Sequence, residues 1–324
     1  MKNSIFKVFR GLNNRTIHFI NSGLHRLEYL VLNANPDTLV YPPIFIIGTP
    51  RSGSTLLYQV LTDYYNIGYL SNFHANFYGS PFLIERLFHP LTSHQLSNYT
   101  SYHGQTQGWL APSECGAFWY RFFRRKPSYI PLEEADSQKL RQLRASIAAL
   151  SNAFGKPVLF KNLYCSLRLR PIAEALPESL FIVIHRDIVD NGHSLLAGRK
   201  KVYGNYNTWW SAEPPNIEQL KKLPPYQQVI EQIQQIYALI NRDQQFIGAN
   251  RFLDLYYEDF CQDTHKNLRK IGAFLKEHAV YLVRRVEISK IPSSFPRTND
   301  IVIDQSMYSR MVEYVNLKRS KCKD

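Results

Sequence analysis

Residues 44–57 constrain the fold of this chain more than any other stretch. A run of β-branched and aromatic residues, Ile44 to Ile47, stops at Gly48, and a turn rich in small residues follows. Apolar residues then resume at helical spacing from Leu56 onward. A strand, a loop and a helix in this order point backbone N–H groups and a helix N-terminus at an anion. The stretch therefore predicts a phosphate-binding loop.

This loop differs from the phosphate loop of nucleotide triphosphatases. Gly48 and Gly53 have the spacing of that loop, but Ser54 stands where the triphosphatases need lysine. Arg51 supplies a cation inside the loop instead. We therefore expect the loop to bind phosphate and to support a chemistry unlike ATP hydrolysis.

Three further apolar runs predict strands of the same sheet. They cover residues 158–160, 180–184 and 252–256. Because these runs lack polar alternation and are separated by helical patterns, they are typical of a buried parallel sheet. Such sheets bind ligands at the carboxyl ends of their strands, where Arg51, Lys161 and Arg186 are expected. The pattern indicates an α/β, P-loop-like three-layer fold with a central, mostly parallel sheet flanked by helices.

The chain divides into an extension and one domain. Residues 1–40 predict a basic helical extension, and residues 41–324 predict a single domain without an internal repeat. The extension carries apolar residues on one helical face, namely Ile17, Ile20, Leu24, Leu27 and Val31. A basic amphipathic helix can lie on an anionic membrane, but such a stripe more often docks on its own domain. Docking is the favoured interpretation.

Other segments predict further helices and loops. Helical patterns cover residues 134–152 and 229–240, the second with a glutamine-rich outer face, and Thr264 is expected to cap a last helix. Residues 75–129 and the tail from Pro292 show little periodicity and are expected to be irregular. Long irregular stretches are commonly binding loops. The aromatic and proline-rich segment 203–225 is expected to form a lid or a connecting loop.

Composition limits the classes of protein that remain. The net charge is +13, and 44% of the residues are hydrophobic, which argues against disorder and suits anionic ligands or surfaces. The four cysteines, Cys115, Cys165, Cys261 and Cys322, form no CxxC pair, so neither a metal site nor a disulfide framework is favoured. No apolar run approaches the ~20 residues of a membrane span. A cytoplasmic protein, with peripheral membrane contact as an option, is the expectation.

A second motif adds to the loop. Arg186 and Asp187 end one predicted strand, and Ser194 follows eight residues after the arginine. With the lysine-free loop from Thr49 to Thr55, this motif resembles the sulfotransferases that use 3′-phosphoadenosine 5′-phosphosulfate (PAPS). The arginine in the loop is most similar to the bacterial and Golgi-type branches of that family. The resemblance follows the order of motifs along most of the chain.

The resemblance implies roles for the residues of both motifs. Arg51 should contact the oxygen that bridges phosphate and sulfuryl group, and the 5′-phosphate should be held by the loop residues Ser52, Gly53, Ser54 and Thr55. Arg186 and Ser194 should hold the 3′-phosphate, and Tyr257 should lie near the adenine. No metal is expected, because the arginines supply the positive charge. The product would be 3′-phosphoadenosine 5′-phosphate (PAP).

The general base is less well defined by the sequence. Cytosolic sulfotransferases use a histidine two residues after the lysine that Lys161 resembles, but that position is Leu163 here. Glu114 is the first candidate for the base and His74 the second, with a surface carboxylate and a buried ring as the alternatives. Lys161 is expected to steady the sulfuryl oxygens. The family's late glycine-rich loop over the 3′-phosphate is missing, and the tail with Arg297, Thr298 and Lys318 could replace it.

The sequence thus predicts an enzyme that transfers the sulfuryl group of PAPS to a hydroxyl or amine acceptor by in-line displacement. A carbohydrate, a lipid and a small molecule fit the acceptor equally well. One alternative is a P-loop kinase-like phosphotransferase that uses ATP and Mg²⁺. Another is a non-catalytic basic adaptor that binds acidic lipid or nucleic acid through the N-terminal helix and the basic cluster from Arg121 to Lys126. No nucleic acid is expected as a partner under the favoured hypothesis.

Overall fold

A single five-stranded parallel sheet forms the centre of the part of the chain that the structure describes. The computed structural model describes residues 14–34, 38–89, 94–102, 104–297 and 300–321. The strand order is β2-β3-β1-β4-β5, and each neighbouring pair is parallel. The strands are β1 (Ile44–Gly48), β2 (Gly68–Tyr69), β3 (Val158–Lys161), β4 (Leu180–His185) and β5 (Phe252–Tyr256). The predicted α/β fold class is confirmed.

The register of the strands decides which residues meet at the carboxyl edge. β1 is buried along its whole length and lies between β3 and β4. Ile46 is level with Lys161 of β3, and Gly48 is level with Ile184 of β4. The segments that follow these three strands therefore leave the sheet at the same edge.

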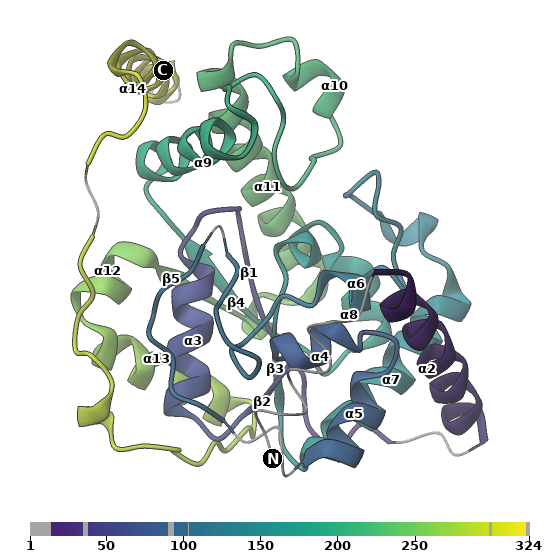
Figure 1. Ribbon diagram of the computed structural model, residues 1–324. Coiled ribbons are helices and arrows are strands. Elements are labelled where there is room, and N and C mark those ends of the chain that lie inside the picture. Colours follow the sequence, from purple (N-terminus) through teal and green to yellow (C-terminus); the bar gives the residue numbers. More distant parts are fainter. Residues whose placement is uncertain (1–13, 35–37, 90–93, 103, 298–299, 322–324) are drawn as a thin grey trace.

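Helices cover both faces of the sheet (Figure 1). One layer consists of α3 (Ser54–Tyr64), α12 (Tyr257–Gln262) and α13 (Thr264–Glu277). The opposite layer consists of α7 (Ser137–Phe154), α8 (Leu169–Ala175) and α11 (Pro225–Ile247). Ile44 and Ile46 face the first layer, whereas Phe45 and Ile47 face the second. Alternate residues of a fully buried strand thus fill two different cores.

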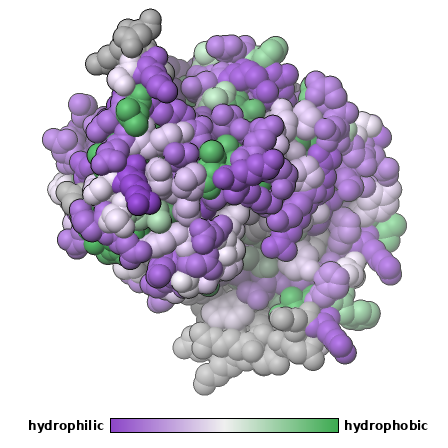
Figure 2. All heavy atoms as spheres, turned by 90° about the horizontal axis from the view of Figure 1, so that it is seen from above, coloured by the Kyte–Doolittle hydropathy of each residue, from purple (hydrophilic) through white to green (hydrophobic). Residues whose placement is uncertain are grey.

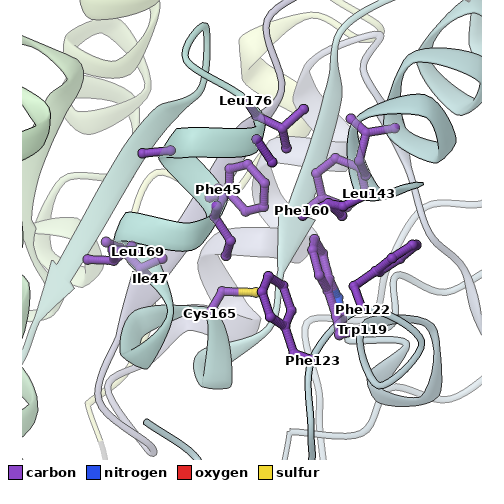
Figure 3. Close-up of a cluster of buried hydrophobic side chains, with 14 of the residues drawn as sticks. Phe45, Ile47, Trp119, Phe122, Phe123, Leu143, Phe160, Cys165, Leu169 and Leu176 are labelled. Carbon is purple, nitrogen blue, oxygen red and sulfur yellow. The ribbon is translucent and has the colours of Figure 1, made fainter. Parts of the chain in front are cut away.

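Aromatic packing fixes the second core. The Phe45 ring stacks on Phe160 and Phe181 of the two neighbouring strands, at centroid distances of 5.3 Å and 5.6 Å. Trp119 contacts Phe160 edge-on at 5.5 Å. Figure 3 shows the rings of Phe45, Phe160 and Trp119 together with Leu143 of α7. Each buried ring removes a large apolar area from water, so this cluster holds strands and helices in one register.

The remaining helices lie around this framework. They are α2 (Asn14–Ala34), α4 (Asn72–Asn76), α5 (Pro81–Phe88), α6 (Gly116–Trp119), α9 (Ile188–Tyr203), α10 (Ile217–Leu220) and α14 (Gln305–Lys321). Short 3₁₀ turns occur at η2 (Leu132–Glu134), η3 (Leu163–Leu167), η4 (Ala249–Arg251) and η5 (Ile288–Lys290). None of the helices built from the described residues is long and apolar enough to cross a bilayer.

Helix α2 docks on the domain, as the sequence favoured. Ile20 and Leu24 pack against the cluster that contains Phe73. Leu27 was expected on the same buried face, but 49% of its surface is exposed. The buried face also includes polar residues: Asn21 is 2% exposed, and Glu28 is fully buried in an ion pair with Arg121. Residues 1–13 of the predicted extension lie outside the described residues.

The tail from Pro292 was expected to be irregular, and this expectation is wrong. The tail contains the helix α14 (Figure 1). Met311 and Val315 of this helix are buried in its contacts with α9 and α11. Only these two side chains of the helix are buried, so its sequence carries almost no apolar period. Similarly, α5 lies inside the stretch 75–129, which was expected to lack structure. Both helices gain their stability from contacts with distant elements.

Two smaller expectations also need correction. Asp263, rather than Thr264, caps α13, because its carboxylate accepts from the N–H of Lys266. The glutamines of α11 do not all face outward. Gln232 is fully buried, and its amide donates to the carbonyl groups of Trp210 and Ala212. A buried amide is tolerated there because the carbonyls satisfy both of its N–H groups.

The face of the molecule seen from above is mostly hydrophilic, and the cysteines of the described residues form no disulfide. Small separate hydrophobic spots interrupt this face (Figure 2). Cys115, Cys165 and Cys261 are free thiols and buried. Cys322 and Thr298 lie outside the described residues.

Candidate active site

The loop after β1 connects strand and helix as the sequence predicts, and three of its residues have positive φ. Gly48 has φ 151°, Arg51 φ 66° and Gly53 φ 90°. A Cβ on Gly48 would lie 2.7 Å from the carbonyl oxygen of Ile184, and one on Gly53 would lie 2.1 Å from the Tyr257 ring. Glycine is therefore required at both positions by the backbone and by close neighbours.

The N-terminus of α3 is left without a side-chain cap. Gly53 occupies the capping position and has no side chain to accept from the first-turn N–H groups. By contrast, Asp187 caps α9 by accepting from the N–H groups of Val189 and Asp190. Free N–H groups and the positive end of the helix dipole make the start of α3 a site for an anion.

One cavity of about 710 Å³ gathers most of the predicted site residues. Its lining includes Arg51, Gly53, Ser54, Thr55, Glu114, Lys161, Arg186, Ser194 and Tyr257. Ser52 does not line the cavity, because it is fully buried and its N–H bonds to Thr49 within the loop. Residues from segments as far apart as β3, α9 and α12 thus meet at the carboxyl edge of the sheet.

Two guanidinium groups stand together at one end of the cavity. The Nε of Arg51 donates to Ser194 Oγ at 3.1 Å, and Nη1 of Arg186 donates to the carbonyl oxygen of Arg51 at 2.9 Å. Within the described residues neither arginine forms an ion pair. Burial and the charge of Arg186 lower the pKa of Arg51. Two such charges without a carboxylate make this end strongly attractive to anions.

Tyr257 closes the same end of the cavity. Its ring lies under the Arg186 guanidinium, 4.8 Å from the centroid, and against Gly53. Burial raises the pKa of Tyr257 to about 12, so its phenol stays neutral. Phe295 and Pro296 of the tail also line the cavity, and Arg297 pairs with Asp190 at 3.2 Å. The tail segment at residues 295–297, which was suggested from the sequence as a replacement for the missing glycine-rich loop, therefore lies at the cavity.

An ion pair lies beside the loop at the end of β3. Lys161 Nζ donates to Thr55 Oγ1 at 3.0 Å and to the Glu114 carboxylate. The Lys161 side chain is 2% exposed, whereas that of Glu114 is 32% exposed. Asn162 donates to the carbonyl oxygen of Glu114 at 3.2 Å and holds its backbone. Glu114 is thus fixed against the loop while remaining accessible from the cavity.

His74 does not lie at this cavity. Its Nδ1 accepts from the N–H of Ser71, and its Nε2 is 3.2 Å from Glu85. The ring is 1% exposed and lines a second cavity of about 300 Å³, together with His89 and His94. The Ser71–His74 pair forms a capping box for α4, so the ring has a structural function.

Three cations of the predicted basic cluster from Arg121 to Lys126 form ion pairs with three different carboxylates. Arg121 pairs with Glu28, Arg124 with Glu134, and Lys126 with Glu213. These partners lie in different parts of the chain, so the cluster does not form one continuous cationic patch. Arg125 and Lys126 instead line the cavity.

Several lining residues were not singled out as site residues by the sequence. They are Tyr99, Arg125, Tyr164, Trp209, Trp210 and Glu213. Two local signals pointed toward them: the basic cluster from Arg121 to Lys126 contains Arg125, and the segment 203–225, an expected lid or connecting loop, contains Trp209, Trp210 and Glu213. No group of three or more His, Cys, Asp or Glu among the described residues is arranged to hold a metal ion.

Known proteins are similar to this chain over most of its length. The model of the family described as the sulfotransferase family matches residues 42–278. Two curated relatives, both named omega-hydroxy-beta-dihydromenaquinone-9 sulfotransferase Stf3, come from Mycobacterium bovis and Mycobacterium tuberculosis. Each is 25% identical over 254 residues, which cover 71% of this chain and 61% of the relative. The chain thus spans about three fifths of the length of these relatives.

Solved structures give a weaker likeness. Sulfotransferase STF9 from Mycobacterium avium is 15% identical with a TM-score of 0.49, covering 89% of this chain and 72% of that protein. The sulfotransferase domain from the curacin biosynthetic pathway is 13% identical with a TM-score of 0.44, covering 86% and 99%. Because the family match extends from before β1 to the end of α13, the chain belongs to the sulfotransferase family.

Proposed function

We propose that this protein binds PAPS and transfers its sulfuryl group to a hydroxyl or amine acceptor. One observation carries the proposal: the guanidinium groups of Arg51 and Arg186, without an ion pair among the described residues, face the same cavity as the uncapped start of α3. A ligand with phosphate groups at two places satisfies all three features. PAPS has this chemistry, and the family membership supports it.

The residues of the loop and of α9 would bind the nucleotide. The N–H groups at the start of α3 and the hydroxyls of Ser54 and Thr55 would hold the 5′-phosphate. Arg186 and Ser194 would hold the 3′-phosphate, and Tyr257 would lie against the adenine. Ser52 would shape the loop from inside rather than touch the ligand, because its side chain is fully buried.

The pair at the end of β3 would perform the transfer. As the acceptor oxygen bonds to sulfur, Glu114 takes its proton, and the bond between sulfur and the bridging oxygen breaks. Arg51 stabilises the negative charge that grows on the leaving phosphate, and PAP is the product. Lys161, beside Glu114 and Thr55, neutralises charge on the sulfuryl oxygens. The proposal leaves His74 out of the reaction.

The acceptor and its location are part of the proposal. The curated relatives are named for a hydroxylated menaquinone, which supports a hydroxyl acceptor. Peripheral membrane contact is supported by the outer side of α2, where Phe19 is 80% and Leu30 is 65% exposed beside Arg26. Pelleting with anionic vesicles and the Phe19→Ser/Leu30→Ser variant would test this contact.

A thermal-shift titration tests the central proposal. PAP at a hundredfold excess over its Kd should stabilise the protein by about 2.7 kcal/mol, visible as a raised Tm. ATP with Mg²⁺ serves as the comparison and should give a smaller shift at equal concentration. The proposal fails if saturating PAP leaves the Tm unchanged. A larger shift with ATP and Mg²⁺ would favour the kinase-like alternative.

A further inference from the structure

Five described cationic side chains line the cavity, and all but one are paired with a carboxylate or assigned to the donor. Lys161 is paired with Glu114, and Lys126 is paired with Glu213 at 2.7 Å. Under the proposed function, Arg51 and Arg186 bind the phosphate groups of the donor. Among the described lining residues, Arg125 is then the cation left without an ion pair.

The sheet order places Arg125 away from the donor's 3′-phosphate. Arg186 follows β4, and β5 lies beyond it, whereas β3 lies on the opposite side of β1. The segment that carries Arg125 packs beside η3, which follows β3. Fully buried Arg168 at the end of η3 holds this segment, because its Nε donates to Ser128 O at 3.2 Å and its Nη2 to Arg124 O at 2.9 Å.

The Arg125 side chain is itself held over an aromatic ring. Its guanidinium lies 5.7 Å from the centroid of Tyr120, and Arg168 lies 6.0 Å from the same ring. Tyr120 contacts Tyr164 edge-on at 6.4 Å, and Tyr164 also lines the cavity. A guanidinium stacked on a ring keeps its N–H edge free for an anion.

Tyr164 connects this arginine with the reacting groups. Burial raises the pKa of Tyr164 to about 12, with further upward contributions from Tyr120, Glu114 and Glu213. The charge of Arg125 acts on the same hydroxyl in the opposite direction. Tyr164, Glu114 and Arg125 line the same cavity.

We propose that Arg125 selects an acceptor that carries an anionic oxygen group, a carboxylate, sulfate or phosphate, at some distance from the hydroxyl that is sulfated. This inference rests on the proposed function and adds the class of acceptor. The planar guanidinium donates two parallel hydrogen bonds to such a group. Trp209 and Trp210 line the same cavity and offer apolar surface to the body of the acceptor.

Two naphthalene probes that differ in one charge test the proposal. 6-Hydroxy-2-naphthoate has a hydroxyl and a carboxylate, whereas 2-naphthol lacks the carboxylate. Binding of each to the PAP-loaded full chain is measured by fluorescence at fixed ionic strength. We expect the naphthoate to bind about tenfold more tightly, as for one charged hydrogen-bonding contact. The Arg125→Ala variant should lose this preference.

Arg124→Ala is the matched control. Arg124 is the neighbouring residue, is paired with Glu134 and does not line the cavity. Its removal deletes one positive charge from the same turn and should keep the tenfold preference. Equal affinity of the two probes for the wild-type protein, no binding of either probe, or an unchanged preference in Arg125→Ala would each overturn the proposal.

The same samples separate this inference from the proposed function. PAP binding is measured first by the thermal shift in the wild-type protein and in both variants. Failure of PAP to bind contradicts the proposed function. The probe preference, measured again without PAP, still decides the role of Arg125. If PAP binds normally but Arg125→Ala keeps the preference for the naphthoate over 2-naphthol, only the inference about the acceptor is contradicted.

Discussion

The side chain of Arg51 reaches from the loop after β1 to Ser194 on α9, where its Nε donates to the hydroxyl at 3.1 Å. These residues come from segments 143 positions apart. The two sites that we assign to opposite ends of the donor are therefore in direct contact. If the Arg51 guanidinium moves toward the 5′-phosphosulfate of a bound donor, its hydrogen bond to the Ser194 hydroxyl has to break.

Arg51 should contribute mainly to the chemical step. Arg51→Ala should lower kcat by about 10²–10³-fold, as for the loss of one donor that stabilises a developing negative charge. Arg51→Lys should keep part of the rate because it retains the positive charge. It should not keep all of it, because lysine lacks the planar set of N–H donors of a guanidinium. Steady-state kinetics with PAPS give the result. An unchanged kcat in Arg51→Ala would remove its role in the reaction.

Arg186 should distinguish nucleotides by their 3′-phosphate. The wild-type protein should bind PAP more tightly than AMP, which lacks that phosphate, by about tenfold or more. Arg186→Ala should reduce this ratio toward one. Because Arg186 also supports the loop through the Arg51 carbonyl, both affinities can fall. The ratio from calorimetry, rather than either affinity, is decisive, and an unchanged ratio would place the 3′-phosphate elsewhere.

Glu114 and His74 should behave differently when each is replaced by glutamine. Glu114→Gln should lower kcat by about 10²–10⁴-fold with little change in PAP affinity, because it removes a proton acceptor. His74→Gln should lower the Tm through the lost contact between the buried ring and Glu85, although glutamine can keep the capping box, and should leave kcat within a few fold. Kinetics and thermal melts on the two variants provide the comparison. A large rate loss in His74→Gln alone would reverse the assignment.

The close contact at Gly53 gives a test of the loop itself. Gly53→Ala should destabilise the protein and abolish PAP binding, because the new Cβ would lie 2.1 Å from the Tyr257 ring. Gly155→Ala is the control, since Gly155 also has a positive φ of 64° but has open space around it. That variant should pay only the backbone cost of about 1–2 kcal/mol. Similar stability and PAP affinity in both variants would contradict the packing argument.

Stability should fall at alkaline pH. Burial raises the pKa of Cys115 and of Cys165 from 9.0 to about 12. The folded state therefore favours the protonated thiols, and their contribution is complete below pH 9 and lost as the pH rises toward 12. Urea unfolding at pH 8, 9, 10 and 11 should show this loss. Cys115→Ala should reduce the slope, whereas identical slopes would show that this thiol does not titrate as expected.

Much of the candidate donor site could be predicted because its signals are local. The pattern from Ile44 to Leu57 specifies strand, turn and helix within a few residues, and Gly53 is required by its own backbone. Arg186 and Lys161 follow fully apolar runs, and the carboxyl ends of parallel strands share one edge. None of these features depends on contacts between distant segments.

Neither helix α14 nor the ion pairs of the basic cluster from Arg121 to Lys126 could be predicted from local patterns. α14 buries only Met311 and Val315, so its helical state depends on α9 and α11. The four neighbouring cations from Arg121 to Lys126 suggested one patch, yet Arg121, Arg124 and Lys126 pair with three different carboxylates and Arg125 forms no ion pair among the described residues. No local pattern encodes such pairings.

By itself the sequence determined the strand, loop and helix of residues 44–57, the parallel sheet and the cations at its carboxyl edge, because strand and turn preferences act over short distances. The tertiary structure alone decided that Glu114, 47 positions from Lys161, lies beside it at the loop, and that His74 faces another cavity. It also decided that Arg125 is left without an ion pair among the described residues. Side chains meet according to the path of the whole chain, and a carboxylate gains a chemical role only from the groups that the fold brings to it.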